Sequence, residues 1–142
     1  MAVKIPPAQI QNLQQIEVVV AGPNGADRLL TIDGQFDSTL DTSSVPSQKE
    51  TFTILVGPVL TRKQFFRASA TASLTKTSLN VNRVPFVASW QILSVDADWD
   101  DESGQVELRI EAEVDVFGAQ GNNVSIFGIG FHVTILAAAA AA

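Results

Sequence analysis

Two alternating segments separated by a short polar turn constrain this chain more than any other feature. Apolar residues fall at every second position in both segments: Leu93, Val95, Ala97 and Trp99 in the first, and Val106, Leu108, Ile110, Ala112, Val114 and Val116 in the second. A two-residue period is typical of strands with one buried face. The sequence DDESG between them ends in Gly104, which suits the left-handed position of a short hairpin loop. Residues 86–116 are therefore predicted to form a long antiparallel hairpin.

The turn also predicts the register of this hairpin. Placing Trp99 opposite Val106 sets Ala97 against Leu108 and Val95 against Ile110. On the other face, the same register pairs residues of opposite and of like charge: Asp96 with Arg109, and Asp98 with Glu107. Each of these charged pairs changes stability by less than about 1 kcal/mol when it is solvated.

The first arm of the hairpin changes phase along its length. Ala88, Trp90 and Ile92 are apolar at even positions, whereas the residues from Leu93 onward are apolar at odd ones. Because a shift of one residue moves every side chain to the other face, the pattern predicts a bulge near Ile92 or a strand that passes from one sheet to another.

Further strands are expected along the rest of the chain, joined by turns rich in Gly, Asn and Pro. They fall at 16–21, 30–36, 50–60, 63–81 and 124–136, with turns at GPNG (22–25) and GAQGNN (118–123) and a long polar loop at 37–49. Seven or eight strands without a convincing helix predict an all-β fold: a single-domain antiparallel β-sandwich of jelly-roll or Greek-key type. We expect an N-terminal arm at 1–15, a β-sandwich domain at 16–136 and an alanine tail at 137–142, the tail being a tag, a linker or a segment with unassigned side chains.

Two of these strands carry unusual faces. In 63–81 the predicted inner face is formed by Phe66, Ala68, Ala70, Ala72 and Leu74, and its alanines are small. Trp90, Trp99 or the phenylalanines of the last strand must therefore fill the space opposite. A phase change predicts a bulge, or the start of a new strand, near Thr77. In the last strand, Phe127, Ile129, Phe131, Val133 and Ile135 are expected to share one face.

Composition excludes several classes of function. The chain has no Cys, so neither disulfides nor thiolate chemistry is available. A net charge of -6 has the wrong sign for gripping phosphate backbones, and we expect no nucleic-acid partner. No run approaches the roughly 18 apolar residues that span a bilayer, and no cleavable signal peptide is visible. We expect a soluble chain without membrane insertion, in a compartment that the sequence leaves open; an extracellular or viral particle is one candidate.

The acidic hairpin tip is the sharpest candidate for a ligand site. Asp96, Asp98, Asp100 and Glu107 stand at positions 1, 3, 5 and 12 of a twelve-residue window, the oxygen-rich spacing of a calcium loop. The window departs from that motif because Asp101 replaces the expected Gly and no helical pattern flanks it. Alternating Asp is also what the solvated side of a strand and its turn would contain. Calcium is thus the one cofactor considered, beside the simpler expectation of none.

Catalytic residues are not recognisable in the sequence. His132 is the only histidine, and one imidazole with no Cys provides neither a His-rich metal site nor a triad of the usual kind. The paired carboxylates of the tip lie on a solvated face with nothing to raise the pKa of either. We therefore expect no enzymatic activity.

A row of hydroxyls offers an interface instead. Ser69, Thr71, Ser73 and Thr75 alternate along one strand, and Phe65 is apolar on the nominal outer face. Such a row can simply reflect the β-propensity of Thr. It can also bind a sugar or an ordered water lattice, or pair with a strand of another subunit. We favour the interface among the functional explanations.

These observations lead to two hypotheses of different class. The first is a non-enzymatic structural or assembly subunit that self-associates or packs on a scaffold protein, as capsid, tail, fibre or surface-layer components do, supported by apolar residues on both strand faces. The alternative is a binding module for carbohydrate or another ligand, calcium-assisted at the tip formed by Asp96 to Glu107.

Overall fold

The chain is an all-β protein of two stacked sheets. The computed structural model describes residues 2–22, 25–82, 84–118 and 122–139. Within these residues the strands are β1 (Ala2–Lys4), β2 (Ile10–Gly22), β3 (Gly25–Asp41), β4 (Ser47–Val56), β5 (Phe65–Asn80), β6 (Phe86–Trp99), β7 (Val106–Gly118) and β8 (Asn123–Ala138), with a short 3-10 turn, η1 (Pro7–Gln9), between β1 and β2. No helix in this described part of the chain is long and apolar enough to cross a membrane.

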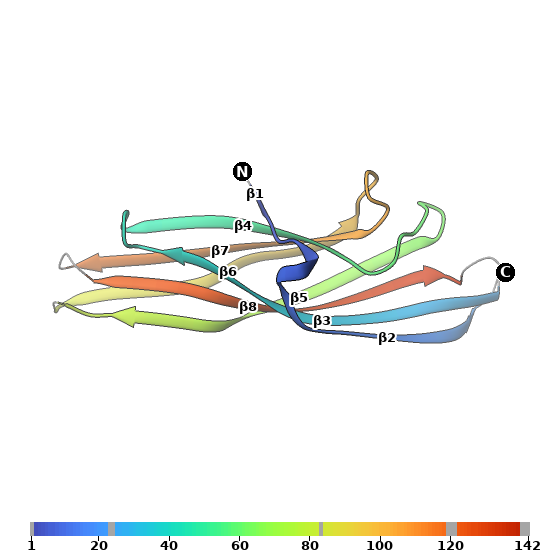
Figure 1. Cartoon of the computed structure of the whole chain (residues 1–142), viewed down its shortest axis with the longest axis horizontal. Helices are drawn as coiled ribbons and strands as arrows, with labels where there is room; N and C mark the ends of the chain where they lie inside the picture. Colours follow the sequence, from blue (N-terminus) through green and yellow to red (C-terminus); the bar gives the residue numbers. More distant parts are fainter. Residues whose placement is uncertain (1, 23–24, 83, 119–121, 140–142) are drawn as a thin grey trace.

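Each sheet has four strands. The first has the order β1-β4-β7-β6 and the second β2-β3-β8-β5. Neighbouring strands are antiparallel except for the short parallel pair β1 and β4. The sheets lie as two layers of a sandwich-like body (Figure 1), and β5 of one lies against β6 of the other.

The core lies between the layers, on the inner faces predicted by the two-residue periods. Phe36 of β3 and Phe52 of β4 meet across the sandwich with ring centroids 5.5 Å apart, and Phe36 also lies 6.5 Å from Phe131. Burying side chains of this size dominates the stability of such a fold. The largest fully buried residues are Phe36, Phe52, Leu30, Ile32, Leu40, Ile54, Leu108, Ile110, Ile126, Ile129, Ile135 and Val106.

The predicted hairpin is confirmed as β6 and β7, including its register. Trp99 pairs with Val106, Ala97 with Leu108, Val95 with Ile110, Asp96 with Arg109 and Asp98 with Glu107. Gly104 has φ +75° in the turn, as expected. A bulge does fall between Ile92 and Ser94. It turns Leu93 outward, where 38% of it is exposed.

The alternative explanation of that phase change is wrong. β6 does not pass between sheets, because it pairs with β7 along its whole length. Its bulge absorbs the one-residue shift locally, so both halves keep their apolar faces on the core.

Bulges also correct two predicted faces. A register shift between Phe65 and Arg67 places Phe65 against the core and leaves Phe66 49% exposed, the reverse of the expected assignment. The bulge expected near Thr77 is present, with shifts on both sides of Lys76. Near the same place Phe127 is 38% exposed and does not share the face of its buried neighbours, which are Val124, Ile126, Ile129, Phe131, Val133 and Ile135.

Strand ends also differ from the predicted ones. β2 begins at Ile10, not Ile16, and η1 and β1 occupy part of the predicted arm. β3 continues to Asp41 across a bulge after Asp37 and β4 begins at Ser47, so the predicted 37–49 loop is mostly strand. The alanine run begins inside β8, with Ala137 buried. The predicted turns at 22–25 and 118–123 and the end of the alanine run include residues outside the described part of the chain.

Candidate functional site

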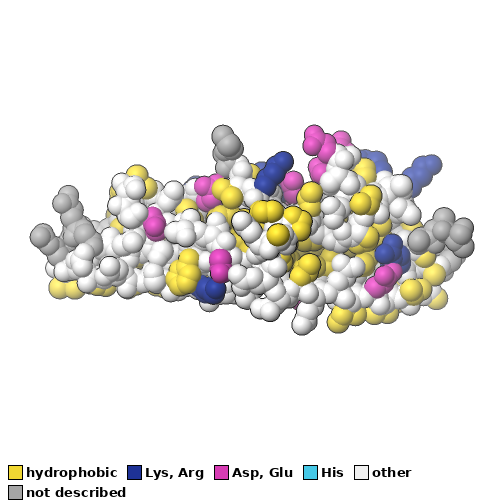
Figure 2. Space-filling model, in the orientation of Figure 1, with side chains coloured by type: hydrophobic (Ala, Val, Ile, Leu, Met, Phe, Trp, Pro, Cys, Tyr) yellow, Lys and Arg dark blue, Asp and Glu magenta, His cyan; other side chains and the backbone are white. Residues whose placement is uncertain are grey.

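β2 has the longest run of exposed residues in the described part of the chain. Among these described residues it lies at the edge of the second sheet with β3 as its one neighbour, and every residue from Gln11 to Ala21 is exposed. Five of these are large and apolar, with exposures of 54% for Leu13, 62% for Ile16, 49% for Val18, 65% for Val19 and 40% for Val20. Hydrophobic spheres lie along the lower right border of Figure 2, where β2 runs in Figure 1.

Both faces of β2 are uncovered. The register sets Glu17 opposite Leu30 and Gln15 opposite Ile32, so these β2 residues share the inner side of the sheet with two core residues. They are nevertheless exposed, as is Val19 beyond them. Ile16, Val18 and Val20 occupy the outer side. A long, exposed, apolar edge strand is a template for pairing with another strand, and proteins ordinarily protect such edges.

The hydroxyl row of β5 lies on the outer face of the same sheet. Ser69, Thr71, Ser73 and Thr75 are all exposed, and they neighbour residues of β8: Ser69 pairs with Thr134, Thr71 with His132 and Ser73 with Gly130. Of the predicted interface residues, only Phe65 is set apart, since it packs against the core. The row therefore contributes to a polar surface.

One ion pair links β5 to β3 across β8, and a hydrogen bond continues from β3 to β2. Lys76 Nζ lies 2.9 Å from Asp37 Oδ1, and Gln11 Nε2 donates to Asp37 Oδ2 at 3.1 Å. These hydrogen bonds, that from Lys76 first, hold the pKa of Asp37 below its usual range. These polar side chains contrast with the exposed apolar side chains of β2.

His132 has partners that the sequence did not indicate. Its Nδ1 lies 2.6 Å from Asp33 Oδ1, and its Nε2 lies 3.3 Å from Thr134 Oγ1. Asp33 is distant in sequence but adjacent in the β3–β8 ladder, so only knowledge of strand order could have found the pair. Carboxylate, imidazole and hydroxyl follow the order used in nucleophilic catalysis.

The surroundings of this trio do not favour catalysis. The side chains of His132 and Asp33 are 45% and 53% exposed, on a sheet face where water would screen their charges. β8 is an interior strand with a ladder on each side, so its backbone N–H groups are committed to β3 and β5 and do not form an oxyanion site. The trio is best described as part of the polar face.

Each of the four candidate calcium ligands has another neighbour in the structure, Arg109 being the one beside Glu107. Asp96 stands opposite Arg109, and Asp98 accepts a hydrogen bond from the Trp99 backbone at 2.8 Å. Asp100 accepts from the hydroxyl and backbone N–H of Ser103 at 2.7 and 3.0 Å, which lowers its pKa. Among the described residues, no group of three or more His, Cys, Asp or Glu is placed to hold a metal ion. Calcium binding at the tip therefore remains a prediction from spacing.

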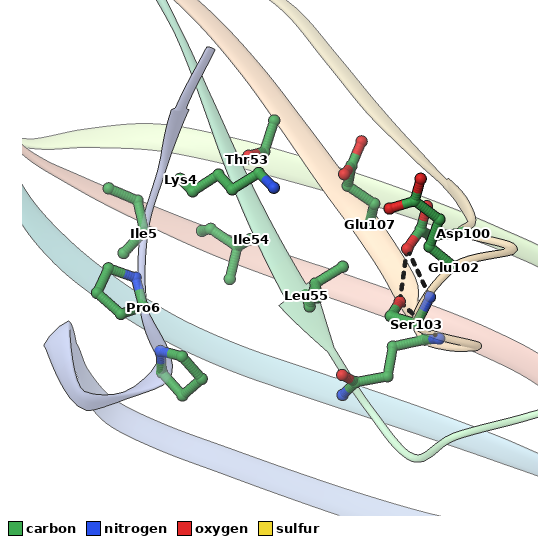
Figure 3. Close-up of a pocket in the computed structure, with 12 residues that line it drawn as sticks. Lys4, Ile5, Pro6, Thr53, Ile54, Leu55, Asp100, Glu102, Ser103 and Glu107 are labelled. Carbon is green, nitrogen blue, oxygen red and sulfur yellow. Dashed lines mark hydrogen bonds between the residues drawn. The ribbon is translucent and has the colours of Figure 1, made fainter.

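A groove of about 660 Å³ lies beside the hairpin tip. Figure 3 shows the N-terminal segment on one side, the β6–β7 turn on the other and β4 between them. Twelve residues line it: Lys4, Ile5, Pro6, Pro7, Thr53, Ile54, Leu55, Asp100, Glu102, Ser103, Gln105 and Glu107. Its size is that of ligand sites in general.

Comparison with known proteins gives no indication of function. No family model, curated protein or solved structure matches the chain.

Proposed function

We propose that this protein is a non-enzymatic structural or assembly subunit that associates with further copies of itself through β2. The observation that carries the proposal is the run of exposed residues from Gln11 to Ala21 on an edge strand. Pairing two such edges would satisfy backbone groups and remove apolar side chains from water in the same step.

A two-fold antiparallel arrangement suits this edge. With Val18 opposite Val18 of the second copy, Ile16 meets Val20, which pairs apolar groups. Glu17 then meets Val19, which keeps the two Glu17 carboxylates apart. Shifting the centre to Glu17 would set the two Glu17 carboxylates against each other, which is unfavourable. A two-fold interface is the commonest way in which identical subunits associate.

The test is the mass of the particle in solution, measured by light scattering. We expect a dimer or larger species for the natural chain, and a monomer for Val18→Lys, because a lysine there places like charges together at the two-fold axis. Val59→Lys is the matched control, since Val59 is 71% exposed in the β4–β5 connection, away from β2. If the partner is a scaffold protein and not a second copy, the purified chain should be monomeric.

For the fold, we propose Greek-key connectivity. Strands β6 and β7 pair, β5 contacts β6 where the sheets meet, and β8 pairs with β5. The resulting order β8-β5-β6-β7, in which the fourth strand returns beside the first, supports a Greek key.

The groove favours a second role, ligand recognition beside the β6–β7 turn. The groove favours carbohydrate less than other ligands, because bound sugars usually stack on exposed aromatic rings. Trp99 is half-buried and its Nε1 donates to the carbonyls of Leu60 and Gly104 at 3.0 and 3.1 Å.

A further inference from the structure

The edge of β4 is interrupted where it enters the groove. β1 pairs with β4 in parallel, from Ala2 opposite Thr51 to Lys4 opposite Thr53, and Ile5 N–H donates to Thr53 O at 2.9 Å. In a parallel ladder the next donor on this strand would be residue 7, and its acceptor Leu55 O. Residue 7 is Pro7, which has no N–H, and the chain turns away there into η1. The arm therefore cannot supply the hydrogen bond that Leu55 O would accept next.

The carbonyl of Leu55 is directed toward the groove for the same reason. Backbone groups point alternately to the two sides of a strand, so Leu55 shares the direction of Thr53, whose carbonyl accepts from Ile5. Its side chain is 37% exposed and lines the groove together with Ile5 and Pro6 (Figure 3). An unpaired strand edge beside apolar side chains is the surface to which an extended peptide adds.

The wall opposite is acidic. Asp100, Glu102 and Glu107 line it, and Lys4 is the one cation among the lining residues. Asp100 accepts hydrogen bonds from Ser103, and Arg109 is close to Glu107, with 3.5 Å between Nη1 and Oε1. The hairpin tip as a whole contains more acidic residues, since 96–107 has six Asp and Glu and no Lys or Arg. Acidic spheres mark this projection at the top of Figure 2.

We infer that the groove binds an extended peptide segment carrying a lysine or arginine, which continues the line of β1 along β4 and directs its cation to Glu102 and Glu107. The carbonyl of Leu55, to which no described residue of the arm donates, supplies the backbone recognition. Leu55 and the exposed Pro6 supply the apolar contact, and the carboxylates supply the charge complementarity. The site shares no residue with β2, so this inference goes beyond the self-association proposed above and stands or falls separately.

The probes are acetylated, amidated pentapeptides titrated into the full chain. TVRVT carries a positive charge, and TVEVT carries a negative charge at the same position. TVRVT with N-methylated backbone amides keeps the positive charge but cannot donate a hydrogen bond to a strand edge. We expect TVRVT to bind about tenfold more tightly than TVEVT, and the N-methylated peptide to bind at least as poorly as TVEVT. Raising the ionic strength should weaken TVRVT, because the carboxylates are near the surface.

Variants and shift mapping locate the site. Glu102→Gln should weaken TVRVT several-fold, whereas Asp101→Asn, an exposed neighbour in the same turn that does not line the groove, should leave it unchanged. Amide shifts in labelled protein should concentrate at Leu55, Ile5 and Ser103. No binding up to about 1 mM peptide, equal binding of TVRVT and TVEVT, or shifts centred on β2 would each overturn the inference. So would concentration-dependent shifts at Leu55 without peptide, since a second copy would then occupy the groove.

Discussion

Glu17 and Leu30 lie opposite each other in the β2–β3 ladder, on the same side of the sheet, yet Leu30 is fully buried and the Glu17 side chain is 39% exposed. The cover provided by the first sheet therefore ends between these two strands. Glu17 is held by an ion pair with Arg28, which lies on the same β3. Beyond it, Val19 is 65% exposed, and this apolar surface is the basis of the proposed assembly role.

The Phe36–Phe52 contact gives the first prediction. Phe52→Ala should lower the free energy of unfolding by about 3–5 kcal/mol, because it leaves a cavity between the sheets and removes the ring from its partner 5.5 Å away. Urea denaturation measures the loss. Phe117→Ala is the control: this ring is 65% exposed, and its removal should cost less than about 1 kcal/mol. Equal losses in the two variants would contradict the assigned core.

Trp99 gives a prediction about the hairpin tip. Trp99→Phe keeps an aromatic ring but removes the indole N–H that donates to Leu60 O and Gly104 O, tying the tip to the β4–β5 connection. A loss of about 1–2 kcal/mol is expected, from thermal or urea unfolding. Trp90→Phe is matched in chemistry and lies on the same strand. A larger loss of stability in Trp90→Phe than in Trp99→Phe would contradict the role given to the Trp99 indole N–H.

Gly104 gives a prediction about backbone geometry. Its φ of +75° is one that other residues rarely adopt, and an added Cβ would lie 2.9 Å from Val59 Cγ1 and 3.2 Å from Leu60 O. Gly104→Ala should therefore destabilise the protein by about 1 kcal/mol or more. A variant that unfolds at the same urea concentration as the natural chain would contradict this geometry.

The acid side of the stability curve should depend on Ser103. The hydroxyl and N–H of Ser103 lower the pKa of Asp100 in the folded state. A lowered folded pKa contributes stability above the unfolded pKa of about 3.9, and that contribution disappears as pH falls through the folded value. Ser103→Ala should thus lower the melting temperature at neutral pH, and the difference from the natural chain should shrink toward about pH 2. A difference that is constant with pH would exclude this linkage.

Local patterns were sufficient for the central hairpin and insufficient for the edges. Alternation in both arms and a short Gly-containing turn determine which residues pair, so Trp99 was correctly set against Val106. The same alternation assigned Phe65 and Phe127 to the wrong faces, because one extra residue in a bulge reverses the faces beyond it.

Surfaces depend on strand order, which alternation does not encode. The sequence IEVVVA in β2 is as apolar as a buried strand, and only its place at the edge of the second sheet exposes it. The Asp33–His132 pair joins β3 to β8, and the groove joins the N-terminal segment to the β6–β7 turn. Each combines residues far apart in the chain, so neither could be predicted from spacing.

Amide hydrogen exchange along β2, followed against protein concentration, tests the assembly role most directly. In an isolated edge strand every second N–H faces solvent and exchanges rapidly, whereas pairing with a second copy protects it. We predict that protection between Ile16 and Ala21 rises with concentration in the natural chain and is lost in Val18→Lys. Rapid exchange at alternate residues of β2 in concentrated protein would contradict self-association through this edge.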